Sequence, residues 1–363
     1  MQSPFTDSSF STDVDLSQYG WTEALDSAFA EHRRAGLTPA RIVRVDRGLC
    51  DAVTEHGPAR AALSALYSTD PLLAPCTGDW AALRPSSDPE LVALLPRRSA
   101  IVRASASRSS HGQVLAANID TVVVAVSLAA PLDAGRVERL LALAWDSGAR
   151  PVVALTKADL AADADAVHAD VRALAPGVDI VTTSAATGQD MDVLTALLSG
   201  TTVLLGPSGA GKSTLGNVLL GEDVLATGAV RAQDGKGRHT TVHRELVLLP
   251  GGGVLIDTPG LRGIGLYDAA DGLQQVFSEI ERLAQDCRFG DCGHDTEPGC
   301  AVQDAIQAGE LTERRLRSHR KLQRENTWAA SRNDARLRAE RTNRQKAITG
   351  HLRATYKFRD RQS

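Results

Sequence analysis

Residues Thr201 to Ser213 read TTVLLGPSGAGKS, and they carry the strongest indication of the fold. Five residues typical of a buried strand are followed by G-x-x-x-x-G-K-[ST], and a helical pattern begins at Thr214. In this setting glycines let backbone N–H groups converge on phosphate oxygens, and the helix N-terminus favours their negative charge. A glycine-rich turn that matches by chance would lack the flanking strand and helix. The motif therefore predicts a nucleoside triphosphate site on an α/β sheet.

Within this motif, Lys212 can reach the β- and γ-phosphate oxygens, and the Ser213 hydroxyl can ligate Mg²⁺. The motif alone does not separate ATP from GTP, or a kinase from a switch GTPase. The predicted phosphate-binding residues are Gly206, Pro207, Ser208, Gly209, Ala210, Gly211, Lys212, Ser213 and Thr214.

Four further apolar runs surround the motif, and helical patterns separate most of them. They are TVVVAVSL from Thr121, PVVALT from Pro151, DIVTTS from Asp179 and GGVLID ending at Asp257. Such alternation predicts a parallel sheet. Residues 243–249 precede a Pro-Gly-Gly-Gly turn and are predicted to form an antiparallel hairpin partner.

Two short motifs at predicted strand ends indicate a guanine base. Asp159, in Thr156-Lys157-Ala158-Asp159, could accept both N1–H and N2–H of guanine, whereas adenine offers neither group. Lys157 would pack its stem along the base. Ser184 and Ala185 would present backbone N–H groups to guanine O6. Each motif taken singly is weak, and an ordinary surface loop is the alternative.

Two further segments are predicted to contact the γ-phosphate and Mg²⁺. Asp257-Thr-Pro-Gly260 follows a strand, so its carboxylate can hold a Mg²⁺-bound water while the Gly260 N–H meets the γ-phosphate. The loop at residues 235–241 ends in tandem threonines, either of which could ligate the metal. The predicted magnesium residues are Ser213, Thr240, Thr241 and Asp257.

The order of these motifs along the chain indicates a circular permutation. Switch GTPases have the phosphate loop first, then a threonine loop, D-x-x-G, N-K-x-D and S-A. Here T-K-A-D and S-A precede the phosphate loop. The permutation keeps the strands in place but leads D-T-P-G directly into the C-terminal region, which would link the nucleotide state to that region.

Cys287-x4-Cys292-x-His294-x5-Cys300 offers three thiolates and an imidazole. This set suits a closed, tetrahedral, structural Zn²⁺ site. Free thiols beside a surface histidine are the alternative. Cys50 and Cys76 are isolated and are interpreted as ordinary small core or loop residues.

Composition excludes several classes of protein. With 363 residues, 43% hydrophobic and 23% charged, the chain is expected to form two or three globular domains. Its apolar runs are shorter than the roughly 20 residues that a membrane helix needs. The first twenty residues carry no basic start followed by an apolar run, so we expect a cytoplasmic protein without membrane association.

The net charge of −4 hides an asymmetry. Residues 301–363 carry 16 Lys/Arg against 7 Asp/Glu, a balance of +9, which leaves 24 against 37 for residues 1–300. A helical run in this basic end could neutralise RNA phosphates, and a solvated charged helix is the alternative. It carries Arg314, Arg315, Arg317, Arg320, Lys321 and Arg324.

The N-terminal third has a different pattern. Residues 1–36 carry a short helical pattern and are treated as an extension. Short strand-like runs between turns, at residues 40–46, 49–55, 78–83 and 100–105, predict a small all-β barrel or sandwich. The cluster from Pro96 to Ser99 could contact phosphates or form a solvated loop.

Taken together, ANIDTVVVAV, GPSGAGKSTL, GKGRHTT, DTPGLR and CRFGDCGHDTEPGCAV resemble successive signatures of the RsgA (YjeQ) family of circularly permuted GTPases. The resemblance covers about residues 37–325. It implies an OB-like barrel at 37–118, a permuted P-loop GTPase domain at 119–268, and a zinc-binding α-helical domain with a basic tail at 269–363. It also implies the small ribosomal subunit and its rRNA as partners. The family usually has Asn where Thr156 stands, so guanine affinity is expected to be weaker.

The catalytic residues are predicted in part from that resemblance. Leu261 follows D-T-P-G where Ras-type enzymes have a water-orienting glutamine, so intrinsic hydrolysis is expected to be slow. The resemblance places His239 in the loop over the γ-phosphate, as the candidate substitute; a solvated or phosphate-contacting histidine is the alternative. The predicted catalytic set is His239, Lys212 and Gly260.

The leading hypothesis is a GTPase that acts in late maturation of the small (30S) ribosomal subunit, binds rRNA, and is stimulated by the subunit. It is expected to be a monomer that uses structural Zn²⁺, and Mg²⁺ with GTP. The second hypothesis is a nucleotide-regulated RNA-binding protein in which hydrolysis is incidental. A P-loop ATPase or kinase is a third, disfavoured by Asp159 and D-T-P-G.

Overall fold

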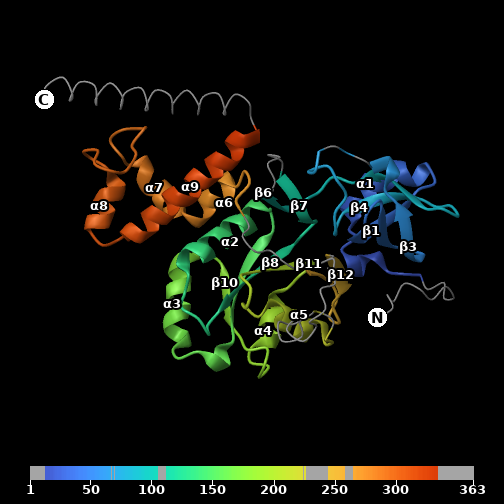
Figure 1. Cartoon of the computed structure of the whole chain (residues 1–363), viewed down its shortest axis with the longest axis horizontal. Helices are drawn as coiled ribbons and strands as arrows, with labels where there is room; N and C mark the ends of the chain where they lie inside the picture. Colours follow the sequence, from blue (N-terminus) through green and yellow to red (C-terminus); the bar gives the residue numbers. More distant parts are fainter. Residues whose placement is uncertain are drawn as a thin grey trace, which may run out of the picture.

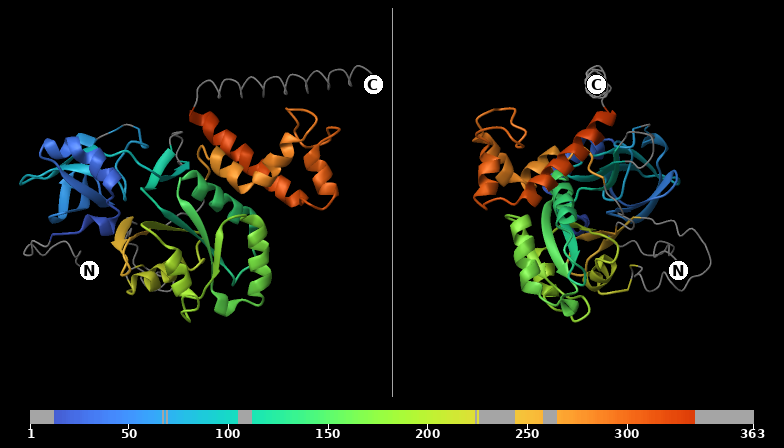
Figure 2. Two further views of the ribbon diagram at one scale, coloured as in Figure 1. Left: turned by 180° about the vertical axis from the view of Figure 1, so that it is seen from behind. Right: turned by 60° about the vertical axis from the view of Figure 1, so that its left-hand side comes forward.

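The computed structural model describes residues 13–66, 68, 70–104, 112–223, 225, 244–257 and 265–333. A barrel and a group of helices lie on opposite sides of a central sheet domain (Figures 1 and 2). In these parts of the chain, no helix is both long enough and apolar enough to span a membrane.

The barrel has five strands and closes in the order β1-β2-β3-β5-β4, with β1 paired to β4. Alternate residues fill it, among them Ile42, Leu83 and Leu91. This order is that of a Greek-key barrel of the OB type, as expected. The strands are β1 (Thr38–Val45), β2 (Leu49–Thr54), β3 (Gly57–Ala62), β4 (Trp80–Arg84) and β5 (Glu90–Leu94), with a 3-10 turn η3 at Ser64–Leu66.

Two barrel strands, β3 and β5, were not among the predicted runs. Strand β3 contains Pro58 and three alanines, a composition that does not indicate a strand, and β3 pairs with β5 only at Ala62. Strand β6 (Ala100–Ala104) was expected among the barrel strands but pairs with β7 (Gly112–Ala117) in a separate two-stranded ribbon.

The segment before the barrel packs onto it. Helix α1 (Glu23–Arg34) begins after Thr22, whose hydroxyl accepts the N–H of Leu25, and it buries Phe29 completely. The short helix η2 (Leu16–Tyr19) precedes it. The rings of Trp21 and Trp80 meet edge to face with centroids 4.8 Å apart.

The central sheet has the order β10-β9-β8-β11-β13-β12. Five strands are parallel and β12 is antiparallel to β13, which confirms the predicted hairpin. Their bounds are β8 (Thr121–Ser127), β9 (Arg150–Thr156), β10 (Asp179–Thr182), β11 (Thr201–Leu205), β12 (Glu245–Leu248) and β13 (Val254–Asp257).

Helices cover both faces of this sheet. Val122 and Val124 of β8 belong to the core that includes α2, whereas Val123 belongs to the core formed with α4 and α5. This period of two explains why the strands read as continuous apolar runs. The helices are α2 (Ala134–Asp146), α3 (Ala164–Leu174), α4 (Met191–Leu197) and α5 (Lys212–Leu220), with a 3-10 turn η4 at Ala158–Leu160.

The C-terminal helices pack against α2. Gly272 lies so close that a Cβ there would be 2.0 Å from the Ala142 carbonyl oxygen, which explains the glycine at this position. Helix α9 in turn contacts α6. The four helices are α6 (Ala270–Val276), α7 (Ser278–Gln285), α8 (Ala301–Gln307) and α9 (Glu313–Asn333).

Candidate nucleotide site and metal centre

The phosphate loop joins β11 to α5 at the carboxyl edge of the sheet, where open α/β sheets bind ligands. Gly206 has φ +154°, and a Cβ there would lie 2.7 Å from the Ala125 carbonyl oxygen. Gly211 has φ +82°, a conformation that favours glycine. Lys212 Nζ donates to the carbonyl oxygens of Gly206 and Pro207, both at 2.8 Å. The ammonium therefore lies across the loop that is predicted to hold phosphate.

Other predicted loop residues show graded exposure. Ala210 is buried, and Ser213 is half-buried at the start of α5. Ser208, Gly209 and Thr214 are exposed at the rim.

The T-K-A-D segment lies beside the phosphate loop. Thr156 ends β9, and its Oγ1 is 2.8 Å from the Ala210 carbonyl oxygen and 3.3 Å from that of Val126. Lys157 adopts a left-handed conformation with φ 62°. The Thr156 hydroxyl thus connects the segment predicted to bind the base with the loop predicted to bind phosphate.

The S-A segment lies beside T-K-A-D. Ser184 Oγ donates to Asp159 Oδ1 at 2.5 Å, and the Ala158 N–H donates to the Thr183 carbonyl at 3.2 Å. Ala185 is half-buried against the core below. Ser184 leaves Asp159 Oδ2 and the remaining lone pairs of Oδ1 for a ligand.

Several predicted residues lie outside the described part of the chain. They are His239, Thr240, Thr241, Gly260 and Leu261. Asp257 ends β13, two strands from β8 in the same sheet, so its backbone reaches the same carboxyl edge.

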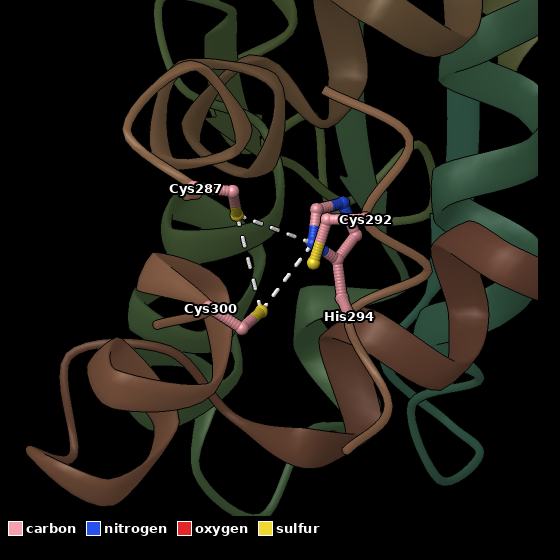
Figure 3. Close-up of side chains that lie close together, drawn as sticks. All are labelled: Cys287, Cys292, His294 and Cys300. Carbon is pink, nitrogen blue, oxygen red and sulfur yellow. Dashed lines mark hydrogen bonds between the residues drawn. The ribbon is translucent and has the colours of Figure 1, made fainter. Parts of the chain in front are cut away.

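The four predicted zinc ligands come together (Figure 3). One donor atom from each of Cys287, Cys292, His294 and Cys300 lies within 4.8 Å of the other three. His294 Nδ1 is 3.6 Å from Cys287 Sγ and 3.5 Å from Cys300 Sγ, and the two sulfurs are 3.9 Å apart. Three thiols and one imidazole around a common centre form a complete tetrahedral donor set, which fits a structural metal ion.

Side chains outside the cluster shape the loop that carries His294. The Glu297 carboxylate accepts the N–H groups of Gly293, Asp295 and Thr296 at 2.8–3.1 Å. A hydrogen bond from its own backbone N–H, together with these bonds, lowers the pKa of Glu297. His294 itself has φ 60°, a strained conformation for a non-glycine residue. The carboxylate therefore helps to hold this loop conformation, a role that no local sequence signal indicates.

Arg320 connects the same loop to α9. Its guanidinium donates to the Gly293 carbonyl and pairs with Asp295, both at 2.7 Å.

The structure corrects the predicted RNA-binding set on α9. Glu138 of α2 is fully buried and is paired with Arg315 at 2.8 Å and Arg314 at 3.0 Å, and it accepts a hydrogen bond from Ser318. Arg315 is 4% exposed and also stacks over Phe277 at 4.4 Å. Arg315 is therefore unavailable to RNA and instead joins α9 to the sheet domain. A single glutamate, Glu138, within the apolar run of α2 was the sequence signal that could have indicated a buried ion pair.

The two arginines of the cluster at Pro96 to Ser99 also form ion pairs within the protein. Arg97 pairs with the fully buried Asp79 at 2.7 Å and donates to the carbonyls of Leu72 and Ala74. Arg98 pairs with Asp120 at 3.2 Å. Arg97 therefore supports the barrel, a role that matches neither of the two alternatives considered for this cluster, phosphate contact and a solvated loop.

A buried arginine joins the barrel to β11. Arg41 Nη2 donates to Thr201 Oγ1 at 2.9 Å, and its guanidinium lies over Trp80 at 4.9 Å. Burial lowers the pKa of Arg41 to about 10. Asp120 accepts the Thr201 N–H at 2.7 Å. No local sequence signal indicates this junction, since Arg41, Asp120 and Thr201 come from distant segments of the chain.

Comparison with known proteins supports the same interpretation. A family model described as RsgA GTPase matches residues 94–267. A Streptomyces avermitilis protein named small ribosomal subunit biogenesis GTPase RsgA is 58% identical, over 90% of this chain and 89% of its own length. A protein of the same name from Streptomyces coelicolor is 56% identical, over 92% of each.

Solved structures show the same fold. YjeQ from Thermotoga maritima is similar with a TM-score of 0.56 and 24% identity, over 79% of this chain and 97% of that one. YloQ, described as a circularly permuted GTPase, has a TM-score of 0.55 over 78% and 93%.

Proposed function

This chain belongs to the RsgA GTPase family, and we propose that it hydrolyses GTP to GDP and phosphate during late maturation of the small (30S) ribosomal subunit. One observation carries the proposal. The phosphate loop, T-K-A-D and S-A converge at one sheet edge, joined by Thr156 to Ala210 and by Ser184 to Asp159. A phosphate cradle beside an oriented carboxylate suits a guanine nucleotide.

Competition between GTP and ATP tests the choice of base. Asp159 Oδ1 is held by Ser184, so the carboxylate is positioned before any base arrives. We expect excess ATP not to displace a fluorescent GDP analogue that GTP displaces. Asp159→Asn should exchange this preference for xanthine, whose O2 can accept from the new amide. Equal displacement by ATP would overturn the assignment.

Mg²⁺ is proposed to accompany GTP, held by Ser213, by Thr240 or Thr241, and through a water by Asp257. Bound there, it would neutralise charge on the β- and γ-phosphates. His239 is proposed to orient the attacking water, and Lys212 and the Gly260 N–H to stabilise charge on the γ-phosphate. Three residues of this set lie within the described chain. Lys212 and Ser213 begin α5, which follows β11, and Asp257 ends β13, so all three lie at the carboxyl edge of the sheet, which supports the assignment.

Steady-state hydrolysis with and without purified small subunits tests the partner. Leu261 cannot polarise water, so the isolated chain should turn over slowly. Subunits that position His239 beside the γ-phosphate should accelerate hydrolysis, and His239→Ala should lose the acceleration while still binding GDP. Equal rates with and without subunits would contradict the proposal.

The second candidate is an RNA-binding protein for which hydrolysis is incidental, and Leu261 is the residue that favours it. Lys212→Ala separates the two. If that variant still leaves the subunit normally, the nucleotide does not control release.

Zn²⁺ is proposed as the ion of the Cys₃His cluster, with a structural role because the four protein ligands complete the tetrahedron. The chain is proposed to be cytoplasmic and monomeric. The proposed boundaries are an extension at 1–36, the barrel at 37–118, the GTPase domain at 119–268 and the zinc-binding domain with its tail at 269–363.

A further inference from the structure

Helix α9 has two chemically different faces. Its inner face packs on the rest of the molecule, and there Glu325 pairs with Arg139 at 2.5 Å while Asn326 accepts the Ala269 N–H at 2.8 Å. The buried residues of this face are Arg315, Leu316, His319, Leu322, Asn326 and Ala329.

The outer face carries three cations and one indole. Arg317, Lys321, Arg324 and Trp328 follow one another at intervals of four, three and four residues, so they form one stripe on a helix with 3.6 residues per turn. All four are exposed; the side chain of Arg317 is 68% accessible, and Trp328 is 44% exposed. We call these four residues the outer stripe. At a rise of about 1.5 Å per residue it spans about 16 Å, enough for several successive phosphates along one strand.

Little negative charge offsets the outer stripe. Glu313 approaches Arg317 only to 4.0 Å, and both side chains are well exposed, so this pair is weak. The other acid of α9, Glu325, is paired with Arg139 on the inner face. The stripe therefore stays positive on a chain whose first 300 residues are strongly acidic.

We propose that the outer stripe binds RNA at a site where an unpaired base adjoins an RNA helix; this inference rests on the proposed function. Arg317, Lys321 and Arg324 neutralise consecutive phosphates, and the indole of Trp328 stacks on the unpaired base. Trp328 is the only large hydrophobic residue exposed on the described part of α9. A membrane-surface helix would need a broad apolar face, so charge and a single aromatic ring favour RNA.

The test uses the full chain, purified small subunits, and an RNA hairpin with or without one unpaired purine. Arg317→Gln/Lys321→Gln/Arg324→Gln removes the three cations. Arg34→Gln/Arg136→Gln/Arg172→Gln is the matched control, since it removes the same charge from exposed positions on α1, α2 and α3. Trp328→Ala and Trp328→Phe test stacking. Unstimulated GTP hydrolysis and thermal melting should match wild type in every variant.

We expect the stripe variant to bind both hairpins at least about 10-fold more weakly, with a log–log salt slope reduced by about 2–3, and the control to bind like wild type. Trp328→Ala should weaken binding of the bulged hairpin by about 10-fold and of the paired one little, and Trp328→Phe should largely restore it.

Three results would overturn this inference: unchanged binding by the stripe variant, equal loss in the control, or competition by anionic vesicles as strong as by RNA. If Trp328→Ala weakens both hairpins equally, base stacking is wrong. The proposed function has a separate readout, because it is contradicted when subunits do not stimulate hydrolysis by the wild-type chain, whatever the hairpins show.

Discussion

At the scale of single residues, Thr156 stands where the resemblance implies asparagine, and the structure shows which contact the hydroxyl makes. Its Oγ1 is 2.8 Å from the Ala210 carbonyl oxygen within the phosphate loop. A threonine therefore provides the contact between the base segment and the phosphate segment, although it lacks the second polar group of an amide.

Thr156→Val tests this contact because it keeps the shape and removes the hydroxyl. The variant loses one hydrogen bond, which contributes about 1 kcal/mol, so we expect it to bind GDP about 5-fold more weakly. Thr156→Asn should bind GDP at least as tightly as wild type. Titration of a fluorescent GDP analogue measures both, and a valine variant with unchanged affinity would show that the contact is unimportant.

At the scale of elements, α2 and α6 meet at an acidic contact. Burial raises the pKa of Asp146, a hydrogen bond from the Gly272 N–H opposes this, and the charges of Asp268 and Asp271 add to it, so that the pKa is about 6. The folded state therefore binds an extra proton between about pH 4 and pH 6, and stability falls as pH rises through that window.

Asp146→Asn should remove this pH dependence. The amide oxygen can still accept the Gly272 N–H, and the buried charge is gone. Above about pH 7 the variant should unfold at higher urea concentration than wild type, whereas below about pH 4 the two should coincide. Asp170→Asn, on an exposed site of α3, serves as the control. A variant less stable than wild type at neutral pH would refute this account.

The segment that carries the Cys₃His cluster, residues 287–300, is a second element whose stability can be tested. Removing the ion with a chelator should release Cys287, Cys292 and Cys300 to react with a thiol reagent. Cys50 and Cys76 should remain protected, because both are buried and burial raises the pKa of Cys50 to about 12. Hydrogen exchange should rise around α8 more than in the barrel interior or on the α4–α5 face of the central sheet, because the cores of these two regions do not include α8. Reaction of all five thiols would instead show global unfolding.

At the scale of the whole molecule, α2 and α9 are joined by buried charges. Glu138 is fully buried with Arg315 against it at 2.8 Å, in a contact between the sheet domain and the C-terminal helices. Each partner also has a second ion pair, Glu138 with Arg314 at 3.0 Å and Arg315 with Glu279 at 2.7 Å. Removing one partner therefore leaves the other buried with fewer opposite charges, which costs up to about 3–5 kcal/mol, whereas replacing both with apolar groups is often neutral.

We therefore expect Glu138→Leu and Arg315→Met each to lower the urea midpoint strongly, and the double variant to recover most of the loss. Equilibrium unfolding of the three variants measures this, with Arg317→Met on the exposed face of α9 as the control. Additive losses in the double variant would show that the pair is not coupled.

The sequence determined the parts of this protein whose signals are local. The phosphate loop needs glycines between a strand and a helix, the parallel strands need continuous apolar runs, and the metal cluster needs four ligands at close spacing, so all three could be identified from short stretches. Strand β3, with Pro58 and three alanines, carries no such signal and was missed.

Which charged side chains face solvent depends on the three-dimensional fold. Arg315 and Arg317 are two residues apart and chemically identical, yet one is 4% exposed against Glu138 and the other lies on the outer stripe. Likewise Arg41 and Thr201, 160 positions apart, meet at 2.9 Å. A charged side chain has no periodic signature of burial, because its environment is set by a partner on another element.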